Sequence, residues 1–108
     1  MKYSKLIPIF SLLIVQFAPV SANTVGFGKG CGGIGGIKCD AGLWCDPRPG
    51  QCGQTDLKGR CVKVPTVCPH VVRPVCGCDN KTYSNDCERV MAQAQKAHQG
   101  KCTGNPKY

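Results

Sequence analysis

The sequence predicts a small, disulfide-rich α+β fold on the basis of three observations. The chain has ten cysteines among its 108 residues, and all ten follow residue 22, a density that is typical of a disulfide scaffold. Turn residues, mainly glycine, proline and asparagine, separate short apolar segments, which favours short strands. Residues 85–94 instead carry apolar side chains at helical spacing. Large apolar residues are few, so we expect cross-links to supply most of the stability.

Residues 1–22 have the composition of an export signal. Lys2 and Lys5 precede an apolar stretch, residues 6–20, and a small-residue cleavage site ends at Ala22. A membrane anchor is the alternative, but the stretch falls short of the roughly 20 residues that span a bilayer. We therefore expect a signal peptide that is removed, a mature protein without membrane attachment, and a secreted or periplasmic location.

The cysteines stand at positions 31, 39, 45, 52, 61, 68, 76, 78, 87 and 102. An even number behind an export signal indicates an oxidising compartment and five disulfides. Structural zinc sites favour paired Cys-x2-Cys knuckles, which this spacing lacks, and five bridges leave no thiol for catalysis. We expect no metal, no cofactor and no enzymatic activity.

The formal net charge is +8, from 14 Lys and Arg against 6 Asp and Glu. A nucleic-acid-binding surface favours clustered basic residues with aromatic residues between them. Here the basic residues form no run, and no aromatic residues are interleaved with them. We expect a solvated basic surface and no nucleic-acid partner.

The order of segments suggests two modules. Residues 23–30 are expected to form a flexible, glycine-rich leader and residues 31–60 a cysteine-rich hairpin module. Residues 61–102 are expected to form a second domain, and residues 103–108 a tail.

The second domain is expected to contain two strands and a helix. A turn at Asp79-Asn80 separates two extended segments. Asn85 is a suitable N-cap, and Glu88 follows it three residues later. The inner face of the helix is expected to carry Cys87, Val90, Met91 and Ala94.

The stretch CPHVVRPVCGCDNKTYSNDC, residues 68–87, resembles the core of a Kazal-type serine protease inhibitor domain. The family pattern is Cys, seven residues, Cys-Gly-x-Asp, then x-x-Thr-Tyr-x-Asn-x-Cys, and Gly100 to Cys102 also suits it. The preceding cysteine-rich segment more loosely resembles the hairpin of follistatin-like modules. The resemblance implies a Kazal-like unit, one short helix on a small antiparallel sheet, preceded by a cysteine-stapled β-hairpin module. The matching residues are Cys68, Cys76, Gly77, Asp79, Thr82, Tyr83, Asn85 and Cys87.

The resemblance also implies a function, that of a monomeric inhibitor rather than an enzyme. Its partner would be a trypsin-, chymotrypsin- or subtilisin-like serine protease, and the scissile bond would be His70–Val71. Asn85 would hydrogen-bond carbonyls on either side of that bond, with Thr82 and Tyr83 as further support. The reactive loop would comprise Pro69, His70, Val71, Val72 and Arg73.

The sequence departs from the family pattern in two ways. The first concerns the cysteines, because Val90 occupies the place of a usual cysteine and Cys78 is additional. The pairings implied by the resemblance, with Cys78 taking over the bond to Cys61, are Cys31–Cys45, Cys39–Cys52, Cys61–Cys78, Cys68–Cys87 and Cys76–Cys102.

The second departure is His70, because a neutral imidazole suits neither an acidic nor an apolar primary pocket well. The alternative function is therefore a Kazal- or follistatin-like extracellular protein-binding module without protease inhibition. A metal- or redox-active cysteine protein is a third reading.

Overall fold

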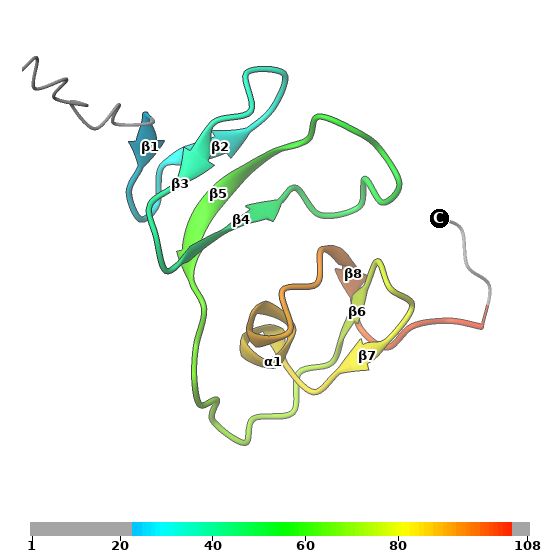
Figure 1. Ribbon diagram of the computed structural model, residues 1–108. Coiled ribbons are helices and arrows are strands. Elements are labelled where there is room, and N and C mark those ends of the chain that lie inside the picture. The colour runs from blue at the N-terminus through cyan, green and yellow to red at the C-terminus, as the bar shows by residue number, and fades with distance from the viewer. Residues whose placement is uncertain (1–22, 105–108) are drawn as a thin grey trace, which may run out of the picture.

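The computed structural model describes residues 23–104, which form two modules joined by residues 64–67. The N-terminal module, residues 23–63, lies above the C-terminal module, residues 68–104, in Figure 1. Short antiparallel sheets, one short helix and five disulfides confirm the predicted disulfide-rich α+β class. The expected export signal, residues 1–22, lies outside the described residues, as do residues 105–108.

The N-terminal module is built around a three-stranded antiparallel sheet. Strand β5 (Lys58–Lys63) lies between β2 (Gly30–Gly32) and β4 (Leu43–Pro47). Strand β1 (Thr24–Val25) pairs in parallel with β3 (Lys38–Cys39) beside this sheet. The module is thus more elaborate than the expected single hairpin.

Residues 23–30, expected as a flexible leader, are instead tied into the N-terminal module. They contain β1 and the first residue of β2. The Gly28 N–H donates to the Cys61 carbonyl at 2.8 Å, and the Asp40 N–H donates to the Val25 carbonyl at 2.8 Å. Glycine composition misled the prediction, because here the glycines allow turns between paired segments.

The C-terminal module has the predicted strand–turn–strand. Strand β6 (Val75–Gly77) lies between β7 (Thr82–Tyr83) and β8 (Lys96–Gln99), and both pairings are antiparallel. Between β6 and β7, Asn80 has φ of 65°, a left-handed conformation that asparagine tolerates better than most residues. The polar turn predicted at this position therefore sets the first two strands of the sheet.

The helix α1 (Asp86–Met91) begins after Asn85, as predicted, but it is short. Gln93 has φ of 53°, so the backbone leaves the helical region before Ala94. The prediction that Met91 lies on the inner face is wrong, since Met91 is 37% exposed. The buried residue of the helix is instead Arg89.

Three disulfides follow the pairing that the resemblance implied, namely Cys31–Cys45, Cys68–Cys87 and Cys76–Cys102. The other four cysteines pair differently. The structure has Cys39–Cys61 and Cys52–Cys78 where Cys39–Cys52 and Cys61–Cys78 were expected.

The position of β5 explains this correction. The strand runs across the boundary expected between residues 60 and 61, so Cys61 is fully buried in the N-terminal module beside Cys39. The loop after β4 instead extends to the C-terminal module, where the Gly50 N–H donates to the Lys96 carbonyl at 3.0 Å. This loop carries Cys52 to within 5.5 Å of Cys78 between Cα atoms.

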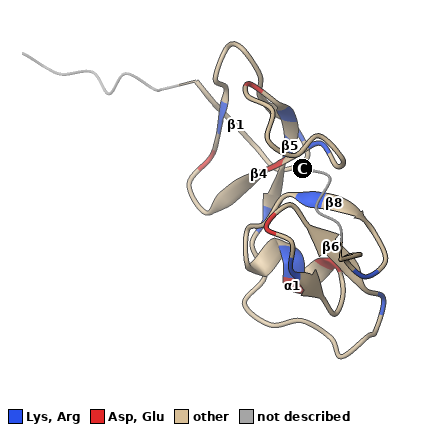
Figure 2. Cartoon of the chain, turned by 90° about the vertical axis from the view of Figure 1, so that its right-hand side faces the viewer, with Lys and Arg blue, Asp and Glu red and all other residues tan. Residues whose placement is uncertain are grey.

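The interior of the molecule is small and rich in sulfur. No helix within residues 23–104 is long and apolar enough to cross a membrane. Lysine and arginine segments are scattered over both modules rather than gathered on one element (Figure 2). The buried apolar residues and cysteines are Cys31, Cys61, Cys68, Val75, Cys76 and Ala97.

Candidate functional site

Residues 69–73 form an exposed segment without helix or strand between two buried anchors. Cys68 precedes the segment and Val75 follows it, and both are buried. Val71 is 46% exposed and Val72 is 79% exposed. Apolar side chains held in solvent are available to a partner. All five residues named in the sequence analysis therefore lie together on the surface.

Asn85 lies beneath this segment and holds it from two sides. Its side-chain amide donates one hydrogen bond to the Pro69 carbonyl at 3.1 Å and another to the Val71 carbonyl at 2.8 Å. A primary amide has two N–H donors, and both are used on carbonyls that flank His70. Asn85 is only 7% exposed, so water is largely excluded from these contacts.

The same side chain also begins the helix. The Oδ1 atom of Asn85 accepts a hydrogen bond from the Glu88 N–H at 2.9 Å, which is the usual N-cap interaction. Capping fixes which way the carboxamide points, because its oxygen is committed to the helix and its nitrogen must face the loop. The local sequence of the helix start thereby orients the loop contacts.

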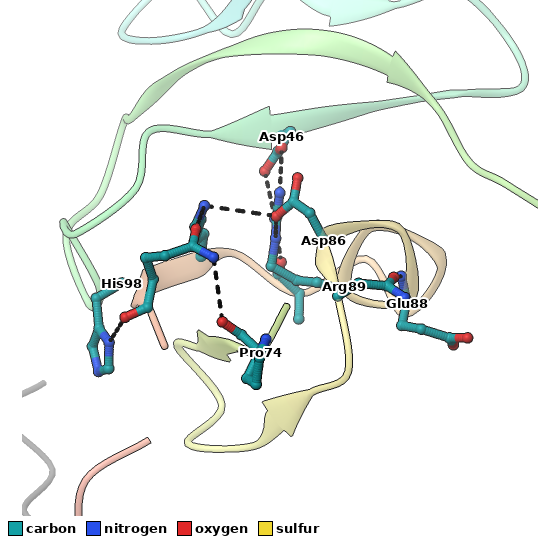
Figure 3. A network of polar contacts seen from close by, with 10 residues as sticks. Asp46, Pro74, Asp86, Glu88, Arg89 and His98 are labelled. Atoms are coloured by element: carbon teal, nitrogen blue, oxygen red, sulfur yellow. Dashed lines mark hydrogen bonds and ion pairs between the residues drawn. The ribbon is translucent and has the colours of Figure 1, made fainter. Parts of the chain in front are cut away.

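The far end of the segment is anchored through its backbone. The Arg73 N–H donates to the Ser84 carbonyl at 2.8 Å, and the Pro74 carbonyl accepts from the Gly100 N–H at 2.8 Å. Gln99 adds a longer bond from Nε2 to the Pro74 carbonyl at 3.3 Å (Figure 3). The segment is therefore held at its start, middle and end.

Two disulfides flank the segment. Cys68 is bonded to Cys87 in α1, and Cys76 in β6 is bonded to Cys102. Each end of the loop is thus covalently attached to the scaffold.

Thr82 and Tyr83 support other parts of the module. The Thr82 hydroxyl accepts from the Cys102 N–H at 2.9 Å, which holds the C-terminal segment. The Tyr83 hydroxyl donates to Asp79. Burial raises the pKa of Tyr83 to about 12, and the Asp79 hydrogen bond acts in the same direction. Both residues stabilise the β6–β7 hairpin and its neighbours, while Asn85 alone of the three bonds the loop directly.

Sequence reasoning missed a buried arginine behind the helix. Arg89 is 3% exposed, and its guanidinium donates to both carboxylate oxygens of Asp46 in β4 at 3.0 Å each. It also donates to Asp86 at 2.8 Å and to the Ala94 carbonyl at 2.8 Å. The spacing of Asp86 and Arg89 could have indicated their pairing, but nothing in the sequence points to Asp46.

These carboxylates perturb the titration of the cluster. Burial by itself would lower the pKa of Arg89, but its hydrogen bonds to the Asp46 and Asp86 carboxylates outweigh this effect and raise the pKa above its usual value. The hydrogen bond from Arg89 lowers the pKa of Asp86, against a smaller opposing effect of burial. The group is thus charged and internally compensated, as a buried arginine requires.

Three cysteine sulfurs of the N-terminal module lie close enough together to resemble a metal site. The Sγ atoms of Cys31, Cys39 and Cys61 lie within 4.8 Å of one another. Each belongs to a disulfide, Cys31–Cys45 or Cys39–Cys61, whereas metals bind the thiolate. The cluster therefore consists of two packed cross-links.

The C-terminal part of the chain matches a known protein family. Residues 52–102 match the Kazal-type serine protease inhibitor domain family. The match begins at Cys52 rather than at the expected residue 61, and so includes the partner of Cys78.

Two curated relatives share sequence with this chain. Over 86 residues the chain is 38% identical to serine protease HTRA1B of Danio rerio, an alignment that covers 75% of this chain and 17% of the relative. Over 42 residues it is 43% identical to serine protease inhibitor Kazal-type 12 of Mus musculus, covering 32% of this chain and 48% of the relative. The chain thus spans less than half of the length of either relative.

Proposed function

We propose that the chain inhibits a serine protease by presenting residues 69–73 as a substrate-like loop, in keeping with the match of residues 52–102 to the Kazal-type serine protease inhibitor domain family. The observation that carries the proposal is the double hydrogen bond from Asn85 to the Pro69 and Val71 carbonyls. These bonds fix the backbone on both sides of His70 before a partner arrives. A pre-ordered loop loses little conformational entropy on docking, which favours tight binding.

The scissile bond in this proposal is His70–Val71. His70 enters the primary specificity pocket, and the active-site serine attacks its carbonyl to form an acyl-enzyme while Val71 becomes a free amine. The Cys68–Cys87 and Cys52–Cys78 bridges join the two fragments, and the Cys76–Cys102 bridge ties the strand that follows the loop to the C-terminal segment. The Val71 amine therefore stays beside the acyl group and re-forms the peptide bond faster than water completes hydrolysis.

The neighbouring prolines suit this role. Pro69 and Pro74 lack a backbone N–H and fix their own φ near −65°, which favours an extended approach to a cleft. His70 and Val71 are both exposed and would make the first contacts on either side of the bond. The proposed targets are trypsin-, chymotrypsin- and subtilisin-like proteases, and the inhibitor acts as a secreted or periplasmic monomer.

The test is a titration of the oxidised chain, residues 23–108, against a panel of trypsin-, chymotrypsin-, elastase- and subtilisin-like enzymes. His70→Lys should shift inhibition toward trypsin-like enzymes, and His70→Leu toward chymotrypsin-like enzymes. His98→Lys is the matched control, since it makes the same change at the other histidine, in β8, and should leave the inhibition profile unchanged. Mass spectrometry after long incubation should find cleavage between residues 70 and 71.

An inert panel would contradict the proposal. If neither the wild-type chain nor the two His70 variants inhibit any of these enzymes, the loop is not competent, and the extracellular binding-module alternative becomes the better account. Cleavage elsewhere than 70–71, with inhibition retained, would move the reactive bond but keep the function.

A further inference from the structure

The buried arginine connects the two modules at the helix that carries the loop support. Arg89 sits in α1, one helical turn after Asn85, and its N–H donates to the Asn85 carbonyl at 3.2 Å. Its guanidinium donates two hydrogen bonds to the carboxylate of Asp46 in the N-terminal module (Figure 3). A continuous path of contacts therefore runs from Asp46 through Arg89 and Asn85 to the loop.

The helix needs an external support. It has six residues, and helices this short are not stable by themselves because nucleation is unfavourable. Its side chains also fill little of the core, since Met91 is 37% exposed and the buried residue is Arg89. Besides the Cys68–Cys87 bridge, the contacts of Arg89 with Asp46 hold the helix, and with it the carboxamide of Asn85.

Asp46 is a firm attachment point. It lies in β4, opposite Arg60 of β5, and directly follows Cys45, which is bonded to Cys31. A side chain at Gly59 would collide with the Asp46 carbonyl, so the two strands approach closely at this residue. The Asp46 carboxylate therefore projects from a strand that is held both by its pairing with β5 and by the Cys31–Cys45 disulfide.

Further links join the modules on the same side. Besides the Cys52–Cys78 bridge and the Gly50–Lys96 backbone bond, Gln95 donates from Nε2 to the Arg48 carbonyl at 2.9 Å. All of them attach the strand β4, or the loop that follows it, to the C-terminal module. These links hold the N-terminal module to the C-terminal module, and none of them involves residues 69–73.

We infer that the N-terminal module is a brace for the loop, and that Asp46 and Arg89 are positioning residues that act through Asn85. The module then contributes to inhibition by restraining the helix, without touching the protease. This inference rests on the proposed inhibitor function for its kinetic consequence, but its structural consequence, a loop restrained by Asp46, can be tested without a protease.

The decisive variant is Asp46→Asn, which keeps the size of the side chain and removes its charge. The matched control is Asp56→Asn, which makes the same change at an exposed residue of the same module. We expect Asp46→Asn to raise the inhibition constant tenfold or more and to speed cleavage of the loop, and Asp56→Asn to change neither by more than twofold. Combined with Asn85→Ser, Asp46→Asn should add less than threefold, because both changes loosen the same contacts.

Hydrogen exchange read residue by residue provides the second arm. The amides of Arg73 and Glu88 report on the loop and the N-cap, and the Gly77 amide, bonded to the Lys81 carbonyl, reports on the sheet. In Asp46→Asn, exchange at Arg73 and Glu88 should accelerate at least tenfold more than at Gly77. Equal acceleration at all three sites, or none, would overturn the brace, as would additive effects in the double variant.

The two arms separate failure of the brace from failure of the proposed function. If the wild-type chain inhibits no protease but Arg73 and Glu88 still respond selectively to Asp46→Asn, the brace stands and the inhibitor function fails. If the wild-type chain inhibits and Asp46→Asn inhibits equally well, the function stands and the brace is refuted.

Discussion

Replacement of Asn85 by serine tests the loop support most directly. Serine is as good an N-cap as asparagine, so it can keep the acceptor for the Glu88 N–H while losing the amide that reaches two carbonyls. The variant therefore separates the two roles that one side chain fulfils in the structure.

The expected magnitude follows from the two lost hydrogen bonds. Each net contribution is about 0.5–1.5 kcal/mol, so together they contribute about 1–3 kcal/mol to holding the loop in its ordered form. Asn85 is buried, which hinders water from replacing the lost donors. If the variant loop must be ordered on binding, the inhibition constant should rise roughly 5- to 150-fold, at about 1.4 kcal/mol per factor of ten.

The assay is the inhibition constant against the protease that the wild-type chain inhibits best, together with the rate of loop cleavage and the thermal unfolding midpoint. Asn85→Ala is the comparison, because it loses the cap as well and should unfold at a lower temperature than Asn85→Ser. An inhibition constant for Asn85→Ser within twofold of wild type would refute the claim that this amide pre-orders the loop.

Three further predictions concern stability and titration. Removing the inter-module bridge with Cys52→Ser and Cys78→Ser, whose sequence separation is 26, should lower the free energy of unfolding by about 3.5 kcal/mol on the loop-entropy estimate; an unchanged denaturant midpoint would contradict it. Arg89 lowers the pKa of Asp86 in the folded state, so this pair stabilises the fold above the unfolded pKa of about 3.9. That stability is lost as pH falls through the lower folded value, and Asp86→Asn should flatten the acid limb of an unfolding titration. Tyr83, whose pKa is raised to about 12, stabilises the fold below the unfolded value of about 10 and ceases to do so as pH rises through 12. An ultraviolet titration of the mature Tyr108→Phe chain that shows a midpoint near 10 would exclude the partly buried, hydrogen-bonded environment of Tyr83.

The sequence by itself determined the fold class and the local structure around the loop. The density of cysteines predicted a cross-linked scaffold, and the Asp79-Asn80 turn predicted the hairpin of β6 and β7. Asn85 marked the helix start because capping is a local interaction between residues three apart. The same residue could be assigned to the loop because the spacing of the motif is fixed by the family pattern.

Only the tertiary structure decided which cysteines meet and how the two modules are joined. Cys61 and Cys78 were expected to pair, but β5 extends past the anticipated boundary and buries Cys61 beside Cys39. Disulfide partners depend on Cα separation in space, and sequence spacing does not fix this across a sheet. Likewise Asp46 and Arg89 are 43 residues apart, and no periodicity relates them. Their contact exists because the tertiary fold brings β4 of one module within side-chain reach of α1 of the other, and a charge is tolerated in that interior only where its partner is already in place.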